Sequence, residues 1–217
     1  MRYALFGDIH GQRIHLERVL KHINTFNNID ELICLGDIFE VNVSKHHQRK
    51  FVFRDIKQVI DLDFDLLDLL KKYRMINGNQ EDRLLDLIPF EKLPSEIRPF
   101  LINLPEKIIL SEKAQVTHGH NFDWVEYEKG KYYHPIVTKW NRSWLFYGHN
   151  HQNALYLVEE NNGVLQYNRQ NIEIGYPIQL NRDSRYLINV GDIKNPNPSW
   201  LLYDDKQGSV TFYKLDD

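Results

Sequence analysis

Residues that can ligate metals occur in five short runs of this chain, and each run follows a segment that predicts a β-strand. The candidate ligands are Asp8 and His10 in GDIHG, Asp37 in LGDIFE, Asn79 in INGNQED, His118 in VTHGH, and His149 with His151 in FYGHNHQ. Oxygen donors mixed with imidazoles suit divalent first-row metals better than Ca²⁺ or a thiolate-type zinc site. Seven such groups exceed the needs of one ion, and a carboxylate can bridge two. The pattern therefore indicates a two-metal centre.

The N-terminal third predicts alternating strands and helices. The expected elements are strands at Tyr3–Phe6, Leu32–Leu35 and from Met75 to Asn77, with helices at Arg13–Asn24 and Arg54–Tyr73. This βαβαβ order implies parallel strands joined by helical crossovers. In such a sheet, ligands collect at the carboxyl ends of the strands, which is where Asp8, Asp37 and Asn79 fall.

The rest of the chain is rich in short strand candidates. They are Lys107–Leu110, Gln115–Thr117, Trp144–Tyr147, Ala154–Val158, Val164–Tyr167, Tyr186–Val190, Ser199–Tyr203 and Ser209–Tyr213, the last two joined by a hairpin turn at 204–208. An α/β fold with two mixed sheets packed as a β-sandwich and flanked by helices accommodates these elements. We expect it to form a single domain over residues 1–217.

Composition limits the environment and the partners. A hydrophobic content of 42% and a net charge of −3 are ordinary for a globular protein, and they do not predict a broad nucleic-acid surface. No apolar run approaches the ~20 residues that span a bilayer, so no membrane partner is expected. The single cysteine, Cys34, lies in an apolar run and is expected to be a buried core thiol. One cysteine and the absence of a signal peptide favour the cytoplasm.

The order DxH, GD, GN, HGH and GHxH resembles that of the calcineurin-like metallophosphoesterases over nearly the whole chain. The ending, with YLINVGD at 186–192 and a closing strand, is similar to that of small bacterial and archaeal members. The resemblance implies an α/β sandwich with a dimetal site at its edge. By motif, it implies that Asp8, His10 and His151 hold one metal, that Asp37 bridges both, and that Asn79, His118 and His149 complete the second.

The chemistry of these residues agrees with that assignment. Gly7 and Gly11 give the backbone of GDIHG the freedom to turn so that Asp8 and His10 converge on one ion. A bridging carboxylate offsets the repulsion between two dications, which would sit ~3.5–4 Å apart. Water bridging two such ions loses a proton near neutral pH and can attack phosphorus in line. We expect Mn²⁺ as the metal, with Fe, Zn, Ni and Mg as alternatives.

Two positions depart from patterns in the wider family. Many phosphomonoesterases of the superfamily carry a histidine after the GN pair, where this chain has Gln80. An amide cannot act as a general acid but can hydrogen-bond a phosphoryl oxygen, so we assign Asn79 and Gln80 to substrate binding and favour diester substrates. The GD motif continues as Ile38-Phe39-Glu40 and lacks the arginine of protein serine/threonine phosphatases. Protein phosphatase activity is therefore not expected.

His120 is the strongest remaining candidate for a catalytic proton donor or phosphate contact, with a hydrogen-bonding role beside the ligands as the alternative. The basic segment 39–53 can form a substrate-facing flap or an ordinary surface insertion. Within it, Ser44–Lys50, with His46 and His47, is interpreted as a solvated loop. His15, His22 and His134 are expected to be structural or surface residues.

The residues and the resemblance together lead us to expect a dimetal-dependent phosphoesterase that uses a bridging hydroxide on a small phosphorylated substrate. A phosphodiesterase or nucleotide-type phosphohydrolase is favoured. The alternatives are a phosphomonoesterase and a non-catalytic scaffold with the same fold; the retention of all seven ligand positions favours an enzyme. The sequence leaves the natural substrate and the oligomeric state open.

Overall fold

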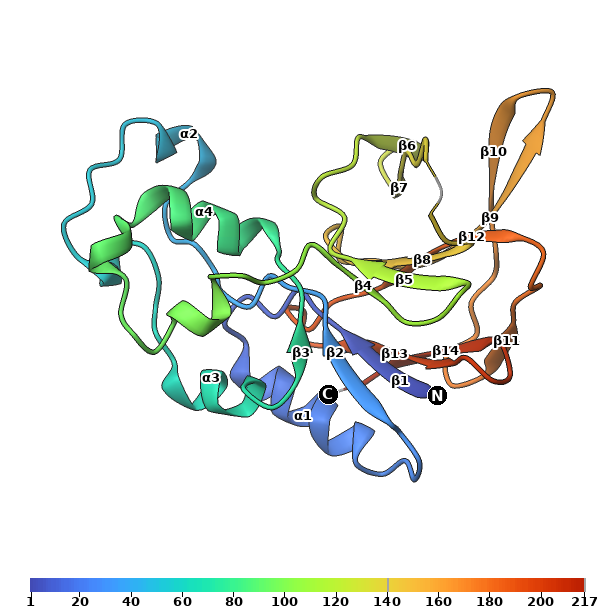
Figure 1. Ribbon diagram of the computed structural model, residues 1–217, viewed down its shortest axis with the longest axis horizontal. Helices are drawn as coiled ribbons and strands as arrows, with labels where there is room; N and C mark the ends of the chain where they lie inside the picture. Colours follow the sequence, from blue (N-terminus) through green and yellow to red (C-terminus); the bar gives the residue numbers. More distant parts are fainter. Residues whose placement is uncertain (140, 217) are drawn as a thin grey trace.

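The computed structural model describes residues 1–139 and 141–216, whose strands form two six-stranded mixed sheets packed face to face (Figure 1). The first sheet has the order β11 (Pro177–Gln179), β14 (Ser209–Lys214), β13 (Ser199–Asp204), β1 (Arg2–Phe6), β2 (Glu31–Cys34) and β3 (Arg74–Met75). The second has the order β10 (Val164–Arg169), β9 (Asn153–Asn161), β12 (Arg185–Val190), β8 (Trp144–Tyr147), β5 (Ala114–Thr117) and β4 (Lys107–Ile109). The predicted α/β fold of two mixed sheets is confirmed.

Four α-helices lie in the described part of the chain, and three of them contribute buried side chains to the core on the outer face of the first sheet. They are α1 (Arg13–Ile23), α2 (Lys45–Gln48), α3 (Phe64–Leu70) and α4 (Asn79–Leu87), with 3₁₀ turns at Ile56–Gln58, Phe90–Lys92 and Arg98–Phe100. Side chains alternate along β1, so that Ala4 and Phe6 join the core beneath the helices while Tyr3 and Leu5 join the core between the sheets. Both faces of β1 are therefore buried, which explains its uninterrupted apolar sequence.

A small two-stranded sheet lies beside the second large sheet. It consists of β6 (Trp124–Glu128) and β7 (Tyr132–Pro135), and Trp124 packs on a third core that contains Tyr147, Tyr156 and Leu187. These strands were not predicted, because β6 is exposed on both faces beyond Trp124 and carries two glutamates. β11, α2 and α4 were also missed, and the predicted solvated loop at Ser44–Lys50 contains α2.

The predicted helix over Arg54–Tyr73 is wrong. The segment instead contains the 3₁₀ turn Ile56–Gln58 and the seven-residue helix α3. Asp55 accepts a hydrogen bond from the backbone N–H of Lys57, and Asp63 accepts one from that of Leu66. Each aspartate thus starts a new helical turn, because its side chain satisfies a free N–H at a helix N-terminus.

The other expected elements agree with the structure to within a few residues at their ends. The helix predicted at Arg13–Asn24 is α1, and the eight strand candidates after residue 107 correspond to β4, β5, β8, β9, β10, β12, β13 and β14. Cys34 is fully buried, as expected, and its burial raises the pKa of its thiol well above the usual range. In the part of the chain that the structure describes, every helix is too short or too polar to span a bilayer.

Strand direction brings distant loops together. β1, β2 and β3 are mutually parallel in the first sheet, as are β5, β8 and β12 in the second. The segments that follow β1, β2, β3, β5 and β8 carry all seven predicted ligands. Parallel strands end at the same edge of a sheet, and here the two edges adjoin, so five segments of the chain meet at one place.

Candidate metal centre

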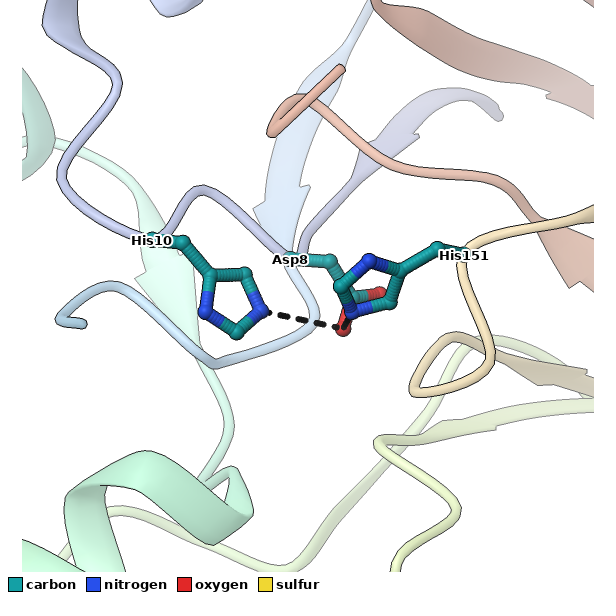
Figure 2. Close-up of side chains that lie close together, drawn as sticks. All are labelled: Asp8, His10 and His151. Atoms are coloured by element: carbon teal, nitrogen blue, oxygen red, sulfur yellow. Dashed lines mark ion pairs between the residues drawn. The ribbon is translucent and has the colours of Figure 1, made fainter. Parts of the chain in front are cut away.

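Asp8, His10 and His151 form one cluster of ligand atoms (Figure 2). Asp8 and His10 lie in the loop after β1, and His151 comes from the loop after β8. The Asp8 Oδ1 atom lies 4.0 Å from His10 Nε2 and 3.4 Å from His151 Nε2. One ligand atom from each residue falls within 4.8 Å of the other two, which is close enough for all three to contact a single ion.

Asp37, His118 and His149 form a second cluster, and Asn79 lies against it. His118 Nε2 is 3.4 Å from Asp37 Oδ2. The Asn79 Oδ1 atom is 3.1 Å from His118 Nε2 and 2.7 Å from His149 Nδ1. The seven sequence-predicted ligands therefore divide into the two groups that motif order implies.

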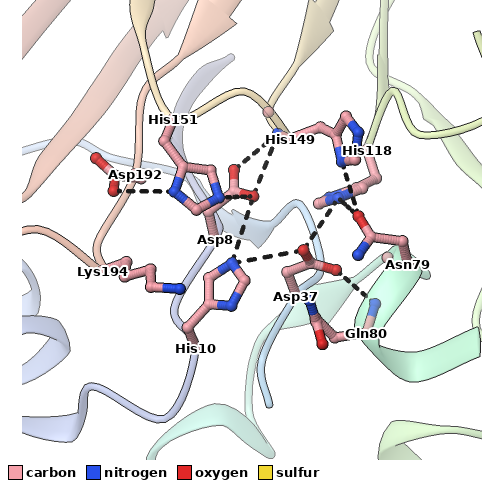
Figure 3. A network of polar contacts seen from close by, with 12 residues as sticks. Asp8, His10, Asp37, Asn79, Gln80, His118, His149, His151, Asp192 and Lys194 are labelled. Atoms are coloured by element: carbon pink, nitrogen blue, oxygen red, sulfur yellow. Dashed lines mark hydrogen bonds and ion pairs between the residues drawn. The ribbon is translucent and has the colours of Figure 1, made fainter. Parts of the chain in front are cut away.

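The Asp37 carboxylate lies between the two clusters (Figure 3). Its Oδ2 atom is 3.5 Å from His10 Nε2 in the first cluster and 3.4 Å from His118 Nε2 in the second. Its Oδ1 atom accepts a hydrogen bond of 2.8 Å from the backbone N–H of Gln80. One oxygen is thus shared between the clusters while the other is held by the start of α4.

The donor set fits divalent cations. Donor atoms bound to one ion at about 2.1 Å lie roughly 3 Å apart when they occupy adjacent octahedral positions, which is near the spacings in the second cluster. His10 Nε2 is buried without a hydrogen-bond partner among the described residues, although it faces two carboxylates. In one orientation, the Asn79 carboxamide directs oxygen toward two imidazole nitrogens; when reversed, it donates hydrogen bonds to His118, His149 and Asp37. The oxygen orientation is the one that a cation requires.

Strained backbone accompanies the ligands. Asp8, His10, Asp37, His149 and His151 have φ angles of 51°, 50°, 52°, 76° and 59°, in the left-handed region that L-residues rarely adopt. Such conformations cost about 1–3 kcal/mol each and persist where the surrounding structure enforces them. Two glycines allow the close approach: a Cβ at Gly78 would collide with the Asp37 carboxylate, and one at Gly148 with that of Asp8.

Groups behind the imidazoles fix their orientation, and sequence reasoning missed most of them. The Leu35 carbonyl oxygen is 2.7 Å from His118 Nδ1, so Nε2 is the nitrogen that faces the cluster. Glu40 Oε2 lies 2.6 Å from His10 Nδ1 and 2.8 Å from Lys194 Nζ. The carboxylate of Glu40, three residues after Asp37, was the available sequence signal.

Asp192 and Glu81 are two further buried carboxylates of the site. Asp192 follows β12 and its Oδ2 atom lies 3.5 Å from His151 Nδ1. Glu81 is fully buried in α4 and accepts hydrogen bonds from the backbone N–H groups of Asp37, Ile38 and Gly78 at 2.8, 2.8 and 3.0 Å. Glu81 thus ties the loop after β2 to the start of α4. The sequence signal for it was an acidic residue in the first turn of an unrecognised helix.

The buried charges form a strongly coupled network. Burial alone would lower the pKa of His118, but the carboxylates of Asp37 and Asp8 raise it to about 10. Burial would raise the pKa of Asp37, and the cationic His118 together with the Gln80 N–H holds it below its usual range. Burial raises the pKa of Asp8. Burial, followed by the charge of His118, lowers the pKa of His149 to about 4. Without metal, the raised pKa of His118 favours a positively charged imidazole between the carboxylates of Asp37 and Asp8.

His120 lies beside the second cluster but outside its ligand set. Its ring centroid is 5.3 Å from that of His118, and its Nε2 atom is 3.0 Å from Asp82 Oδ2. Burial, followed by the charge of His118, lowers the pKa of His120. The imidazole thus adjoins the second cluster, and Asp82 holds its orientation.

Gln80 is not placed as a phosphoryl contact requires. Its side chain is buried, and its Oε1 atom accepts hydrogen bonds from the backbone N–H of Val41 at 3.2 Å and from Arg83 Nη1 at 3.0 Å. The bond to Asp37 in Figure 3 comes from the Gln80 backbone. The carboxamide oxygen thus holds the loop after residue 40 against α4. Buried N–H donors need an acceptor, and the Gln80 oxygen supplies it, so this oxygen is not available to the site.

The remaining histidines agree with their expected structural or surface places. His22 Nδ1 accepts a hydrogen bond from Trp200 Nε1, and buried His134 stacks on Tyr167 with ring centroids 3.9 Å apart. His15 Nδ1 lies 3.1 Å from the Ile193 carbonyl oxygen. His46 and His47 are exposed, although they lie in α2 rather than in a loop.

Among the described residues, a cavity of about 420 Å³ is bordered by His10, Glu40 and Lys194, and two further cavities adjoin the clusters. One of about 730 Å³ is bordered by His151 and Asp192 and includes the aromatic ring of Tyr132 and the cations Arg169 and Lys214. The other, of about 410 Å³, lies between α2 and α4; its residues are Lys45, Gln48, Arg49, Asn79, Asp82 and Arg83. Cavities therefore adjoin the centre beside His10, His151 and Asn79.

Comparisons with known proteins agree with this geometry. A family profile described as the calcineurin-like phosphoesterase superfamily domain matches residues 1–199. A metallophosphoesterase from Sphaerobacter thermophilus superposes with a TM-score of 0.62 at 20% identity, covering 100% of this chain and 89% of that one. A putative diadenosine tetraphosphatase superposes with a TM-score of 0.53 at 16% identity, covering 100% and 94%. These likenesses show the fold. No curated protein matches the chain in sequence.

Proposed function

The chain belongs to the calcineurin-like phosphoesterase superfamily, and from this premise we propose that it hydrolyses phosphoester bonds with two divalent metal ions. We further propose a phosphodiester or a nucleotide-type phosphoester as the substrate. Manganese is the metal that we expect, with Fe, Zn, Ni and Mg as alternatives.

The position of Asp37 carries the proposal. Its Oδ2 atom lies within 3.5 Å of one imidazole nitrogen from each cluster, and the two clusters contribute oxygen and nitrogen donors only. Asp8, His10 and His151 would hold one ion, and Asn79, His118 and His149 the other, with Asp37 shared. When bound, such a pair of ions supplies Lewis acidity, which activates water as a nucleophile and stabilises charge on the phosphoryl oxygens.

The protein contributes orientation and proton control. Leu35, Glu40 and Asp192 hold the imidazoles of the two clusters in fixed directions, which preserves the geometry that the ions require. We assign to His120 the role of donating a proton to the leaving oxygen. Asp82 orients the imidazole of His120. Gln80 supports the adjacent loop, so we assign proton donation at this centre to His120 and not to the residue after the GN pair.

The space beside His151 accommodates the rest of a substrate. The cavity of about 730 Å³ lies within the range of small-molecule sites, and it combines an aromatic ring, amide side chains and cations. A nucleoside linked to the scissile phosphate has complementary chemistry. This supports a nucleotide-type substrate over a bare phosphate.

A metal add-back experiment tests the proposal. Chelated protein is supplied with Mn²⁺, Fe²⁺, Zn²⁺, Ni²⁺ or Mg²⁺, and the hydrolysis of bis-p-nitrophenyl phosphate is compared with that of p-nitrophenyl phosphate. We expect activity that returns with about two equivalents of metal and a higher kcat/KM for the diester. A higher kcat/KM for the monoester would favour a phosphomonoesterase. Inactivity with every metal, in protein shown to bind two ions, would contradict the proposed hydrolysis.

A further inference from the structure

Positive charge gathers in the cavity between α2 and α4, at the side of the metal centre away from His151. Three cations border this cavity of about 410 Å³: Lys45, Arg49 and Arg83. Asn79 of the second ligand cluster forms another part of its wall, so the cavity and the metal centre share a side chain. This local excess of positive charge contrasts with the net charge of −3 of the whole chain.

The single carboxylate at the border of this cavity is already engaged. Asp82 Oδ1 accepts a hydrogen bond of 2.5 Å from Asn77 Nδ2, and its Oδ2 atom lies 3.0 Å from His120 Nε2. Within residues 1–139 and 141–216, neither Lys45 nor Arg49 has a carboxylate at ion-pair distance. Both side chains are exposed and lie four residues apart across the end of α2. Like charges at this spacing destabilise a helix slightly, and a bound anion would remove that cost.

Arg83 is the rigid part of the same wall. Its guanidinium donates hydrogen bonds to the Gln80 side chain at 3.0 Å, to the Gln48 side chain at 3.3 Å and to the Val43 carbonyl oxygen. These bonds join α4 to α2 and hold the segment around α2 against the edge of the metal centre. The segment thus forms a wall of the candidate site, which favours a substrate-facing role for it.

We propose that Lys45 and Arg49 form a phosphate-binding arm that engages a second phosphate of the substrate, one that is not hydrolysed in the same step. The inference rests on the proposed function, because it assumes that the scissile phosphate sits at the two ligand clusters. A planar guanidinium and a flexible ammonium on one wall match the several oxygens of a phosphate. The preferred substrates are then phosphoesters with at least two phosphates, such as nucleoside diphosphates and triphosphates.

The test compares ADP with AMP, which share a nucleoside and differ by one phosphate. Their affinities for manganese-loaded protein are measured by isothermal titration calorimetry at constant free metal, for wild type and for the variants Lys45→Ala, Arg49→Ala and their combination. We expect the double variant to bind ADP at least tenfold more weakly and to change the affinity for AMP by less than twofold. Arg49→Lys should retain most of the affinity for ADP, since it keeps the charge.

Lys50→Ala is the matched control, because Lys50 is an exposed cation of the same segment that borders a different cavity. Thermal unfolding of every variant verifies that the fold is intact. Equal weakening of ADP and AMP, no change in either, or an equal effect of Lys50→Ala would each overturn the arm. Hydrolysis of bis-p-nitrophenyl phosphate is measured in parallel. Loss of ADP selectivity in a protein that hydrolyses no phosphoester would support the arm and contradict the proposed function. Active variants with unchanged ADP selectivity would contradict the arm and support the proposed function.

Discussion

The fully buried carboxylate of Glu81 accepts a 2.8 Å hydrogen bond from the backbone N–H of Asp37, the residue that lies between the two ligand clusters. The same carboxylate accepts bonds from Ile38 and Gly78. Burial, followed by the nearby charge of Asp37, raises the pKa of Glu81 to about 7. One side chain from α4 therefore fixes the left-handed turn that presents Asp37, so a residue outside the ligand set determines the geometry of the site.

Glu81→Gln should destabilise the protein and weaken metal binding. The amide that replaces one oxygen would direct N–H groups at backbone N–H donors, and a lost hydrogen bond to a charged group costs about 2 kcal/mol. We expect the free energy of unfolding of metal-free protein to fall by roughly that amount in urea denaturation. Glu91→Gln, at an exposed position, is the control and should leave the free energy unchanged. Equal stability of both variants would show that Glu81 does not hold the turn.

Asp37→Asn should abolish hydrolysis and reduce bound metal while the fold persists. The asparagine can still accept the hydrogen bond from the Gln80 N–H, but it loses the negative charge shared by the two clusters. Metal analysis of the purified variant measures the outcome, and Asp68→Asn on the surface is the matched control. A variant that keeps two full equivalents of metal would contradict the assignment of Asp37 as the bridging ligand.

Metal uptake at pH 7 should release at least one proton per protein. The pKa of His118 is about 10 without metal, so its imidazole is protonated at pH 7 and must lose a proton to bind an ion. Burial raises the pKa of Asp8, so its carboxyl group should release a further fraction of a proton when metal binds. Affinity should therefore rise with pH above neutrality, whereas unperturbed histidines would make it level off above about pH 6.5. Calorimetric titration in buffers of different ionisation enthalpy counts the protons; a count near zero would contradict a protonated His118 in the metal-free site.

His120→Ala should impair substrates with poor leaving groups most. If His120 protonates the leaving oxygen, a phenyl ester with a high leaving-group pKa should lose at least tenfold in kcat/KM. The p-nitrophenyl ester should lose much less, because its leaving group departs unprotonated. Two equivalents of metal should stay bound, since His120 Nε2 faces Asp82 rather than the ligand atoms. Equal losses for both esters would assign His120 to positioning alone.

Gln80→His should leave the ratio of monoesterase to diesterase activity within about twofold of wild type. The Gln80 side chain is buried and bonded to Val41 and Arg83, so an imidazole there would disturb the loop rather than reach the leaving group. We expect a loss of stability of about 1–2 kcal/mol in thermal unfolding, from the unsatisfied backbone N–H. A clear gain in monoesterase activity would mean that this position faces the substrate after all.

The sequence by itself determined the candidate ligands and the strands that they follow. Asp8, Asp37, Asn79, His118 and His149 each follow a short apolar segment, and β-strands that are buried on both faces have that local pattern. Side-chain chemistry at strand ends is a local property, so the donors and their motif order could be predicted without coordinates. The prediction of one helix over residues 54–73 was wrong because Asp55 and Asp63 act as N-caps. Each starts a new helical turn and so divides the segment.

Only the tertiary structure decided which atoms face one another. Glu40, Glu81 and Asp192 act on histidines or loops up to 44 residues away in sequence, and their contacts depend on how the parallel strands end at a common edge. The place of Lys45 and Arg49 beside Asn79 likewise depends on the bonds of Arg83 between two helices. Strand pairing and long-range hydrogen bonds set these positions, and a one-dimensional pattern of residue types does not encode the left-handed turns that aim the side chains.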